Sequence, residues 1–326
     1  MKELGGFIEL ERNCGEMLYD DGIKLNCGRN ALAYLILAKG IKKLAMPYFM
    51  CDSCDSVLRE QNVSVRRYSV GWDLKPVSIS LDKDEWLYLV NFYGQLSNTF
   101  IRELVSRYGR VIIDNVQAYF QPPVPGVDTI YSCRKFFGVP DGAVLFTQQK
   151  LEDDLEQDES FERMRFLLGR FERTASEFYP EYVANNEIFS REPIKRMSRL
   201  TENLLRGISY EAVKQRRTEN YSFLHEVLKS ENGLEVQIPE GPFMYPFYTE
   251  NGTQIRKELQ KKKVFVPMLW PNVLEAADAN AVACRLAENV LPLPCDQRYT
   301  EEDMKYMSDV LQMEMEKTGT PKNAQR

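Results

Sequence analysis

Apolar and polar residues follow two rhythms along the first two-thirds of the chain. Residues 30–39 repeat apolar side chains at helical spacing and are followed by Gly40, which predicts a helix that ends there. Further helices are predicted around 53–61 and over 100–108. Short apolar runs bounded by turn residues predict buried strands at 43–46, 63–68, 86–90, 110–113, 129–132 and 142–147. This alternation predicts an α/β fold with a mostly parallel sheet covered by helices.

The pattern changes after residue 150. From 151 to about 217 it becomes helical and highly charged, and the acidic runs at 152–154 and 156–159 are interpreted as solvated helix faces. The last third mixes predicted helices at 210–229, 254–262 and 301–316 with predicted strands at 241–248 and 264–267. We therefore predict a large domain over 1–200, a small C-terminal α+β domain over 201–317 and a disordered tail over 318–326.

The composition of the chain mainly excludes classes of partner and location. The chain has 326 residues, of which 44% are hydrophobic and 28% charged, and a net charge of −6. Its basic residues are not clustered, which argues against nucleic acid as a partner. No apolar run approaches the roughly 20 residues that a membrane-spanning helix needs, and the first residues lack the apolar core of a secretory signal. We expect a cytoplasmic protein without a membrane partner.

The soft-ligand residues do not form a metal pattern. There are seven cysteines, of which Cys51 and Cys54 form a lone C-x-x-C, and His225 is the only histidine. A zinc site would need two more soft ligands nearby, so we predict no metal and free thiols. Because His225 lies in an amphipathic stretch, acid–base chemistry is expected to rest on Lys, Asp, Glu, Tyr or Cys side chains.

Candidate binding residues follow the predicted strands, at the edge where open α/β sheets bind ligands. Gly28, Arg29 and Asn30 stand at the start of the first helix, where unpaired N–H groups would hold a phosphate. A glycine before a helix is common, so a purely structural interpretation stays equally open.

Asp114 directly follows the apolar residues of the strand predicted at 110–113. A carboxylate in that place must be paired or hydrogen-bonded, because burial otherwise neutralises it. It would either cap the following segment or face a cationic ligand group. Gln117, three residues later, would reach the same space if that segment turns helically.

Lys135 follows the next predicted strand, 21 residues after Asp114, and precedes an apolar run that begins with Phe136. Lysines in apolar settings form Schiff bases, although a loop lysine that only reaches solvent is the better interpretation of the residue alone. Ser132 lies close enough to bind a phosphate of the same ligand. An anionic phosphate, a cationic ring nitrogen and an aldehyde need a helix start, a carboxylate and an amine. That division of labour is the one used by pyridoxal-phosphate (PLP) enzymes.

The chain resembles the DegT/StrS family of PLP-dependent, fold-type I aminotransferases over nearly its whole length. The segments that carry the resemblance are 27–32 for the phosphate turn, 44–49 for a strand ending in proline and an aromatic loop, 90–95 for His-Leu-Tyr-Gly-Gln, 113–118 for Glu-Asp-Ala-Ala-Gln-Ala, 132–135 for the cofactor lysine, 141–144 for Gly-Gly-Ala-Val, 196–198 for Arg-Met-Ser and 291–294 for Leu-Pro-Leu.

The resemblance implies a homodimeric aminotransferase that uses PLP, an amino donor and a keto or aldehyde acceptor, in amino sugar biosynthesis with nucleotide-linked sugars. It implies that Lys135 carries the cofactor and that Asp114 keeps the ring nitrogen protonated. The same comparison places Gln117 near the ring's phenolic oxygen, and the phosphate on the backbone and side chains of Gly28, Arg29, Asn30 and Ser132.

Several positions depart from the family pattern. Arg29 replaces a usual threonine and Asn91 a common histidine. Cys51 falls where an aromatic residue stacks on the ring, unless Phe49 or the neighbouring Tyr48 takes over that role. Arg196 would act across the subunit interface.

These departures keep two alternatives open. One is a PLP-dependent dehydratase, against which the presence of Lys135 weighs because such family members lack the lysine. The other is a catalytically degenerate binding or regulatory protein with the same fold.

Overall fold

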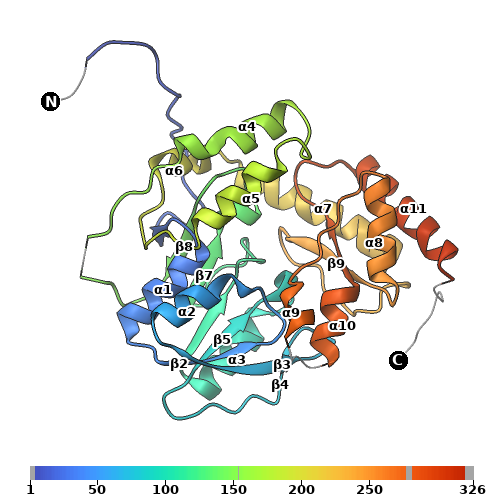
Figure 1. Cartoon of the computed structure of the whole chain (residues 1–326), viewed down its shortest axis with the longest axis horizontal. Coiled ribbons are helices and arrows are strands. Elements are labelled where there is room, and N and C mark those ends of the chain that lie inside the picture. The colour runs from blue at the N-terminus through green and yellow to red at the C-terminus, as the bar shows by residue number, and fades with distance from the viewer. Residues whose placement is uncertain (1–3, 153, 277–280, 320–326) are drawn as a thin grey trace.

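A computed structural model describes residues 4–152, 154–276 and 281–319. Its centre is an eight-stranded sheet with the strand order β1-β8-β7-β6-β5-β2-β3-β4 (Figure 1). The strands are β1 (Ile23–Leu25), β2 (Lys43–Pro47), β3 (Ser64–Val70), β4 (Pro76–Val77), β5 (Trp86–Val90), β6 (Val111–Asp114), β7 (Asp128–Ser132) and β8 (Ala143–Phe146).

The middle of this sheet is parallel. Strands β3, β2, β5, β6 and β7 pair in parallel, whereas β8, β1 and β4 join by antiparallel pairing. The mostly parallel α/β sheet predicted from the sequence is thereby confirmed. Because β6 and β7 are parallel neighbours, with Asp114 opposite Ile130, their carboxyl ends share one edge of the sheet. Residues that follow these two strands are therefore brought together.

Helices pack around the sheet and continue beyond it. The α-helices are α1 (Gly28–Lys39), α2 (Asp55–Glu60), α3 (Asn98–Tyr108), α4 (Arg165–Glu172), α5 (Tyr179–Ile188), α6 (Arg199–Arg206), α7 (Tyr210–Leu228), α8 (Gly252–Lys261), α9 (Asn272–Glu275), α10 (Ala281–Asn289) and α11 (Glu301–Lys317). Short 3-10 turns are η1 (Asp52–Cys54), η2 (Phe92–Gly94), η3 (Cys133–Lys135) and η4 (Phe161–Met164).

Local sequence sets several helix boundaries. Gly40 ends α1 in the left-handed conformation that glycine adopts without strain, with φ of 60°. Ser97 caps α3 by accepting from the Phe100 N–H, and Thr300 forms a capping box with Asp303 at the start of α11. These signals explain why the helices predicted from the pattern begin and end close to their predicted bounds.

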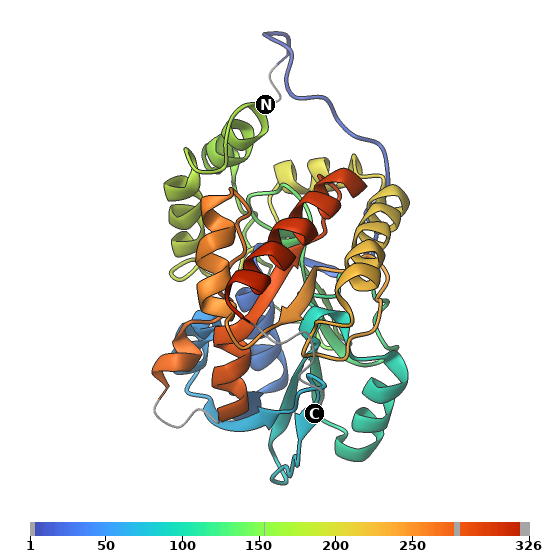
Figure 2. The same cartoon turned by 90° about the vertical axis from the view of Figure 1, so that its right-hand side faces the viewer.

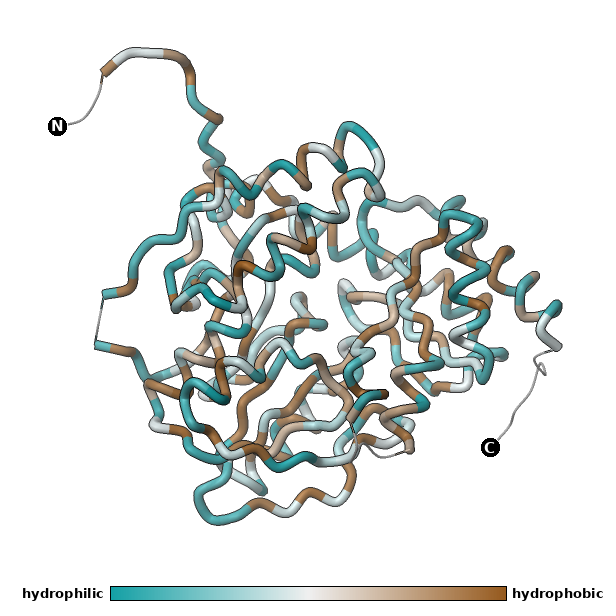
Figure 3. Tube along the Cα trace, in the orientation of Figure 1, coloured by the Kyte–Doolittle hydropathy of each residue, from teal (hydrophilic) through white to brown (hydrophobic). Residues whose placement is uncertain are grey.

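A second, smaller sheet pairs β9 (Met244–Tyr248) with β10 (Val290–Pro294) in antiparallel register. Helices α7, α8, α10 and α11 contact these strands or one another, and together they form the part of the molecule turned toward the viewer in Figure 2. Buried apolar residues come from strands of both sheets, and Figure 3 shows the hydropathy along the whole trace. In β6 and β7 every residue is buried, as expected for the centre of a covered parallel sheet.

Some predictions of local structure were wrong. Residues 264–267 form no strand: Val264 and Val266 are buried and Phe265 is exposed, so burial alternates, but no strand pairs with this segment. The charged runs after residue 150 lie in an irregular segment rather than on helix faces, at least at the described residues. Strands β1 and β10 were not predicted, and of the predicted tail, 320–326 lie outside the described residues. None of the helices in the described part of the chain has the length and apolar character needed to cross a bilayer.

Candidate active site

Asp114 is the last residue of β6 and is only 7% exposed. Its two carboxylate oxygens accept hydrogen bonds from the Tyr88 hydroxyl, at 2.8 Å, and from the Val116 N–H, at 3.0 Å. Burial raises the pKa of the Asp114 carboxyl, while the nearby Lys135 charge and the two hydrogen bonds lower it. Within the described residues no cation lies at ion-pair distance from this carboxylate, so it forms no direct salt bridge there.

Lys135 ends the 3-10 turn η3 that follows β7. Its position at the carboxyl edge next to β6 explains why its charge acts on Asp114. The Lys135 Nζ lies 5.5 Å from the ring centroid of Phe243, which comes from the segment before β9. The apolar setting predicted from the sequence is only partly present, because Phe136 and Phe137 turn into the core while Lys135 is exposed.

Gln117 is buried beside the same edge. Its Oε1 accepts the backbone N–H of Tyr93 at 2.8 Å, and because an N–H can only donate, the amide orientation is fixed. The Nε2 group is then the donor end of this amide. Tyr93 adopts a left-handed backbone conformation, with φ of 53°, to present this N–H.

The start of α1 has the positive character that suits a bound anion. The first intrahelical bond runs from Ala31 N–H to Cys27 C=O, so the N–H groups of Gly28, Arg29 and Asn30 precede the helical ladder. A Cβ on Gly28 would lie 3.7 Å from the Val116 side chain, which places this helix start beside the segment after Asp114. These N–H groups and the positive end of the helix favour a phosphate.

Arg134 is a site residue that the sequence did not reveal. It lies between Ser132, the buried last residue of β7, and Lys135, and donates to the Asn186 Oδ1 on α5. Its Nε is buried without a hydrogen-bond partner. Burial and the charge of Arg29 lower the pKa of Arg134. Two guanidinium groups thus lie near the helix start; no local sequence signal could have predicted this, because their proximity depends on packing.

The side chains of two predicted cofactor contacts, Asn30 and Asn91, form hydrogen bonds within the protein. The Asn30 amide donates to Asn26 Oδ1 at 3.0 Å and to the Pro193 carbonyl at 2.8 Å, so only its backbone remains for a ligand. The Asn91 amide donates to Asn115 and Gln121 and accepts from the Leu96 N–H. The Asn91 side chain therefore holds the turn that carries Tyr93.

Phe49 and Cys51, the two residues predicted to face the ring, lie in different surroundings. Phe49 is buried and packs on Phe92 and Trp270, with ring centroids at 5.2 and 4.5 Å. Cys51 is half-buried, with its Sγ 2.9 Å from the Ser53 hydroxyl. Cys51 lies close enough to Tyr88, the hydrogen-bond partner of Asp114, to interact with it electrostatically.

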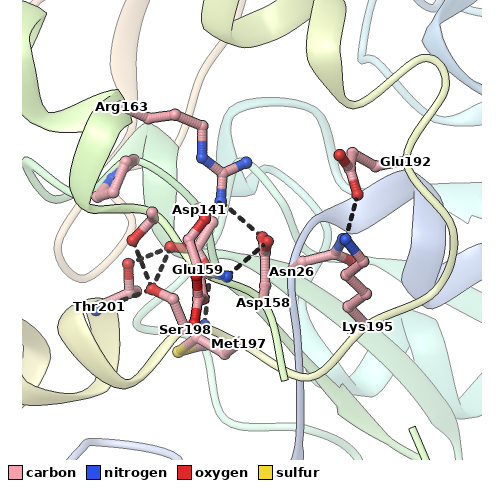
Figure 4. Close-up of polar contacts among 12 residues, drawn as sticks. Asn26, Asp141, Asp158, Glu159, Arg163, Glu192, Lys195, Met197, Ser198 and Thr201 are labelled. Carbon is pink, nitrogen blue, oxygen red and sulfur yellow. Dashed lines mark hydrogen bonds and ion pairs between the residues drawn. The ribbon is translucent and has the colours of Figure 1, made fainter. Parts of the chain in front are cut away.

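Arg196 lies outside this cluster. Its guanidinium is half exposed and 3.8 Å from Asp154. The segment around it is anchored by Asp141, whose carboxylate accepts from the Ser198 N–H and hydroxyl, both at 2.7 Å, and from the Thr201 hydroxyl (Figure 4). Asp141 precedes β8, so this network fixes the loop after Lys135 to the start of α6.

Comparison with known proteins identifies the fold. No family model and no curated protein sequence matches the chain. Among solved structures, it is similar to a DegT/DnrJ/EryC1/StrS aminotransferase from Brucella abortus, with 16% identity over 89% of this chain and 85% of the other and a TM-score of 0.61. A Streptococcus pneumoniae protein assigned as a sugar aminotransferase, in its PLP form, gives 13% identity, 92% and 89% coverage and a TM-score of 0.63. DesI, solved in the presence of its TDP-sugar product, has 14% identity over 90% of this chain and 80% of the other, with a TM-score of 0.63. The chain has the fold of these aminotransferases, as predicted.

The raised pKa of Asp114 predicts a stability change in the cofactor-free protein. Because the folded-state pKa lies above the ordinary value of 3.8, this carboxyl contributes its full stability only at low pH and loses it as pH rises through the folded-state pKa. Asp114→Asn should therefore raise the melting temperature at about pH 8 but not at about pH 4. Thermal unfolding monitored by circular dichroism measures this. An Asp84→Asn control, at an exposed carboxylate, should show no such gain at the higher pH.

Proposed function

We propose that the chain is a PLP-dependent aminotransferase, which moves an amino group from a small-molecule donor to a keto or aldehyde acceptor. The observation that carries this proposal is the pair formed by Asp114 and Lys135 at the shared edge of β6 and β7. A buried carboxylate without an ion-pair partner in the described chain is unfavourable unless a cationic group of a ligand meets it.

The residues present fit PLP. Its ring nitrogen would meet Asp114, and its aldehyde would meet the Lys135 amine. The helix start at Gly28, together with Arg29 and the unpartnered Nε of Arg134, suits a doubly charged phosphate. Gln117 would donate its Nε2 to the phenolic oxygen, because its Oε1 is occupied by Tyr93. Ser132 is a further phosphate ligand in this proposal.

The side chains then have distinct chemical tasks. When bound, PLP supplies an electron sink for the negative charge that remains on a substrate carbon after its proton is removed. Asp114 would hold a proton at the ring nitrogen, and its hydrogen bonds from Tyr88 and Val116 fix the orientation of the carboxylate for that role. The Lys135 amine would hold the aldehyde, and the same amine would move the proton of the substrate carbon.

We infer that the acceptor is a sugar, in the nucleotide-linked form. The support is the similarity in fold to proteins such as DesI, whose structure was solved with a TDP-sugar product. A dehydratase is disfavoured because Lys135 is present, and a binding protein without catalysis would retain the cofactor without exchanging amino groups.

We infer that the protein is a homodimer in the cytoplasm. Segment 161–182, here called the α4–α5 face, exposes more than half of four large apolar side chains: Phe161, Leu168, Phe171 and Tyr179. Exposed apolar side chains of this size favour cover by a partner. Helix α5 also contacts the lysine loop, through Asn185 to the Pro140 carbonyl, so a second copy on this face would lie near the site. The half-exposed Arg196 could then act across the interface.

Seven free thiols agree with a reducing compartment.

Visible absorbance tests the cofactor assignment. The purified protein mixed with PLP should turn yellow, and an amino donor should bleach the colour. Lys135→Ala should lose the yellow band, because no amine then captures the aldehyde. Lys150→Ala, at an exposed position after β8, should keep it. An unchanged band in the Lys135 variant would contradict the assignment, and colour that no donor bleaches would favour the binding protein.

Sedimentation velocity tests the dimer. Phe171 is 92% exposed at the end of α4, so Phe171→Glu should leave the folded monomer intact. Burying the new charge in an interface should raise the dimer dissociation constant about tenfold or more. Phe265→Glu, at an exposed aromatic residue of the C-terminal part, is the matched control and should sediment as the unaltered protein does. A monomer at all concentrations in the unaltered chain would refute the dimer.

A further inference from the structure

Arg217 on α7 is a buried cation without a carboxylate partner in the described chain. It is only 2% exposed. Its Nε donates to Gln297 Oε1 at 2.7 Å, its Nη1 to the carbonyls of Pro242 and Phe243 at 2.9 and 3.4 Å, and its Nη2 to the Phe136 carbonyl at 3.1 Å. The guanidinium also lies 4.6 Å from the Phe136 ring centroid. All its acceptors are therefore neutral.

This arrangement is costly for a residue that only fills space. Burial lowers the pKa of Arg217 to about 10. The nearby Asp296 carboxylate does not compensate it directly, because both Asp296 oxygens bind Arg298, at 2.6 and 2.7 Å. An apolar side chain of similar size would avoid this desolvation. The guanidinium fork, however, can bind carbonyls on separate segments at fixed angles, which neither an apolar side chain nor lysine can reproduce.

The segments that Arg217 joins are the two that flank the Lys135 amine. Phe136 is the residue after Lys135, and its carbonyl also accepts from Gln297 Nε2 at 2.9 Å. Phe243 carries the ring that lies 5.5 Å from the Lys135 Nζ. One side chain of α7 thus fixes both the turn that carries the lysine and the aromatic ring beside its amine.

We propose that Arg217 is a positioning residue for Lys135, acting through the Phe136 carbonyl and the backbone of Phe243. With the fork in place, the amine extends beside the Phe243 ring at the sheet edge where Asp114 lies. Gln297 hydrogen-bonds both the guanidinium and the Phe136 carbonyl. We call this set of hydrogen bonds, from Arg217 and Gln297 to the backbone of Phe136 and Phe243, the clamp. This inference rests on the proposed role of Lys135 and adds that its geometry is set from the C-terminal part of the chain.

Two variants and one matched control test the clamp. Arg217→Lys keeps the charge but loses the fork, and Gln297→Met removes the second hydrogen bond to Phe136 while Arg217 remains. Arg216→Lys is the matched control. Arg216 is the adjacent, half-exposed arginine; its guanidinium lies 3.5 Å from the Glu219 carboxylate, and it is not among the donors to these carbonyls. Each protein is prepared without cofactor, checked by thermal unfolding, and mixed with PLP well below its melting temperature. The rate at which the yellow band appears is then followed.

We expect the rate of band formation to fall about tenfold or more in Arg217→Lys and by a smaller factor in Gln297→Met, since a misplaced amine meets the aldehyde less often. In turnover, kcat should fall by a similar factor while KM for the amino donor changes less than about threefold. Arg216→Lys should match the unaltered protein in all these measurements. A role confined to packing would lower the melting temperature without changing the rate in the folded protein.

The outcomes separate this inference from the proposed function. If the unaltered protein forms the band and both variants form it at the same rate, the clamp is refuted while the cofactor assignment stands. If Arg217→Lys does not fold, Gln297→Met decides alone, and an unchanged rate in it refutes the clamp. If the unaltered protein forms no band with PLP, the proposed function fails and the clamp with it.

Discussion

The carboxylate of Asp114 lies at the end of a fully buried strand, and the chain around it neither neutralises it with a cation at ion-pair distance in its described part nor leaves it to solvent. Two hydrogen bonds, from Tyr88 and from the Val116 N–H, orient it without compensating its charge. Such a group raises the free energy of the folded chain. The rest of the site is understandable as the means by which a ligand with a cationic ring nitrogen would relieve that cost.

The sheet topology makes this arrangement possible. Parallel pairing of β6 with β7 brings the residues after both strands to one edge, so that Lys135 approaches Asp114 although the two are separated in sequence. The helix start at Gly28 borders the same edge through its proximity to Val116. Side chains further away then fix the details: Asn91 holds the turn of Tyr93, Tyr93 orients Gln117, and Asp141 ties the lysine loop to α6.

Sequence reasoning found the parts of the site that depend on local signals. Asp114 and Lys135 follow apolar runs of strand length, and Gly28 precedes a helical repeat, so their places at strand and helix ends could be predicted. The side chains that complete the site come from distant segments. Tyr88 is 26 residues from Asp114, Arg134 is 52 from Asn186, and Arg217 is 81 from Phe136. No periodicity links such pairs, because only the packed fold brings them together. The same limit explains the wrong strand at 264–267, where a short apolar run exists but no neighbouring strand pairs with it.

A crystal structure of the protein grown with PLP tests the central claim most directly. The account predicts electron density for one cofactor that is continuous with the Lys135 Nζ at one end of the ring and has its ring nitrogen within hydrogen-bond distance of the Asp114 carboxylate. Density joined to a different lysine, or a bound ring whose nitrogen meets no carboxylate while Asp114 remains with Tyr88 alone, would contradict it.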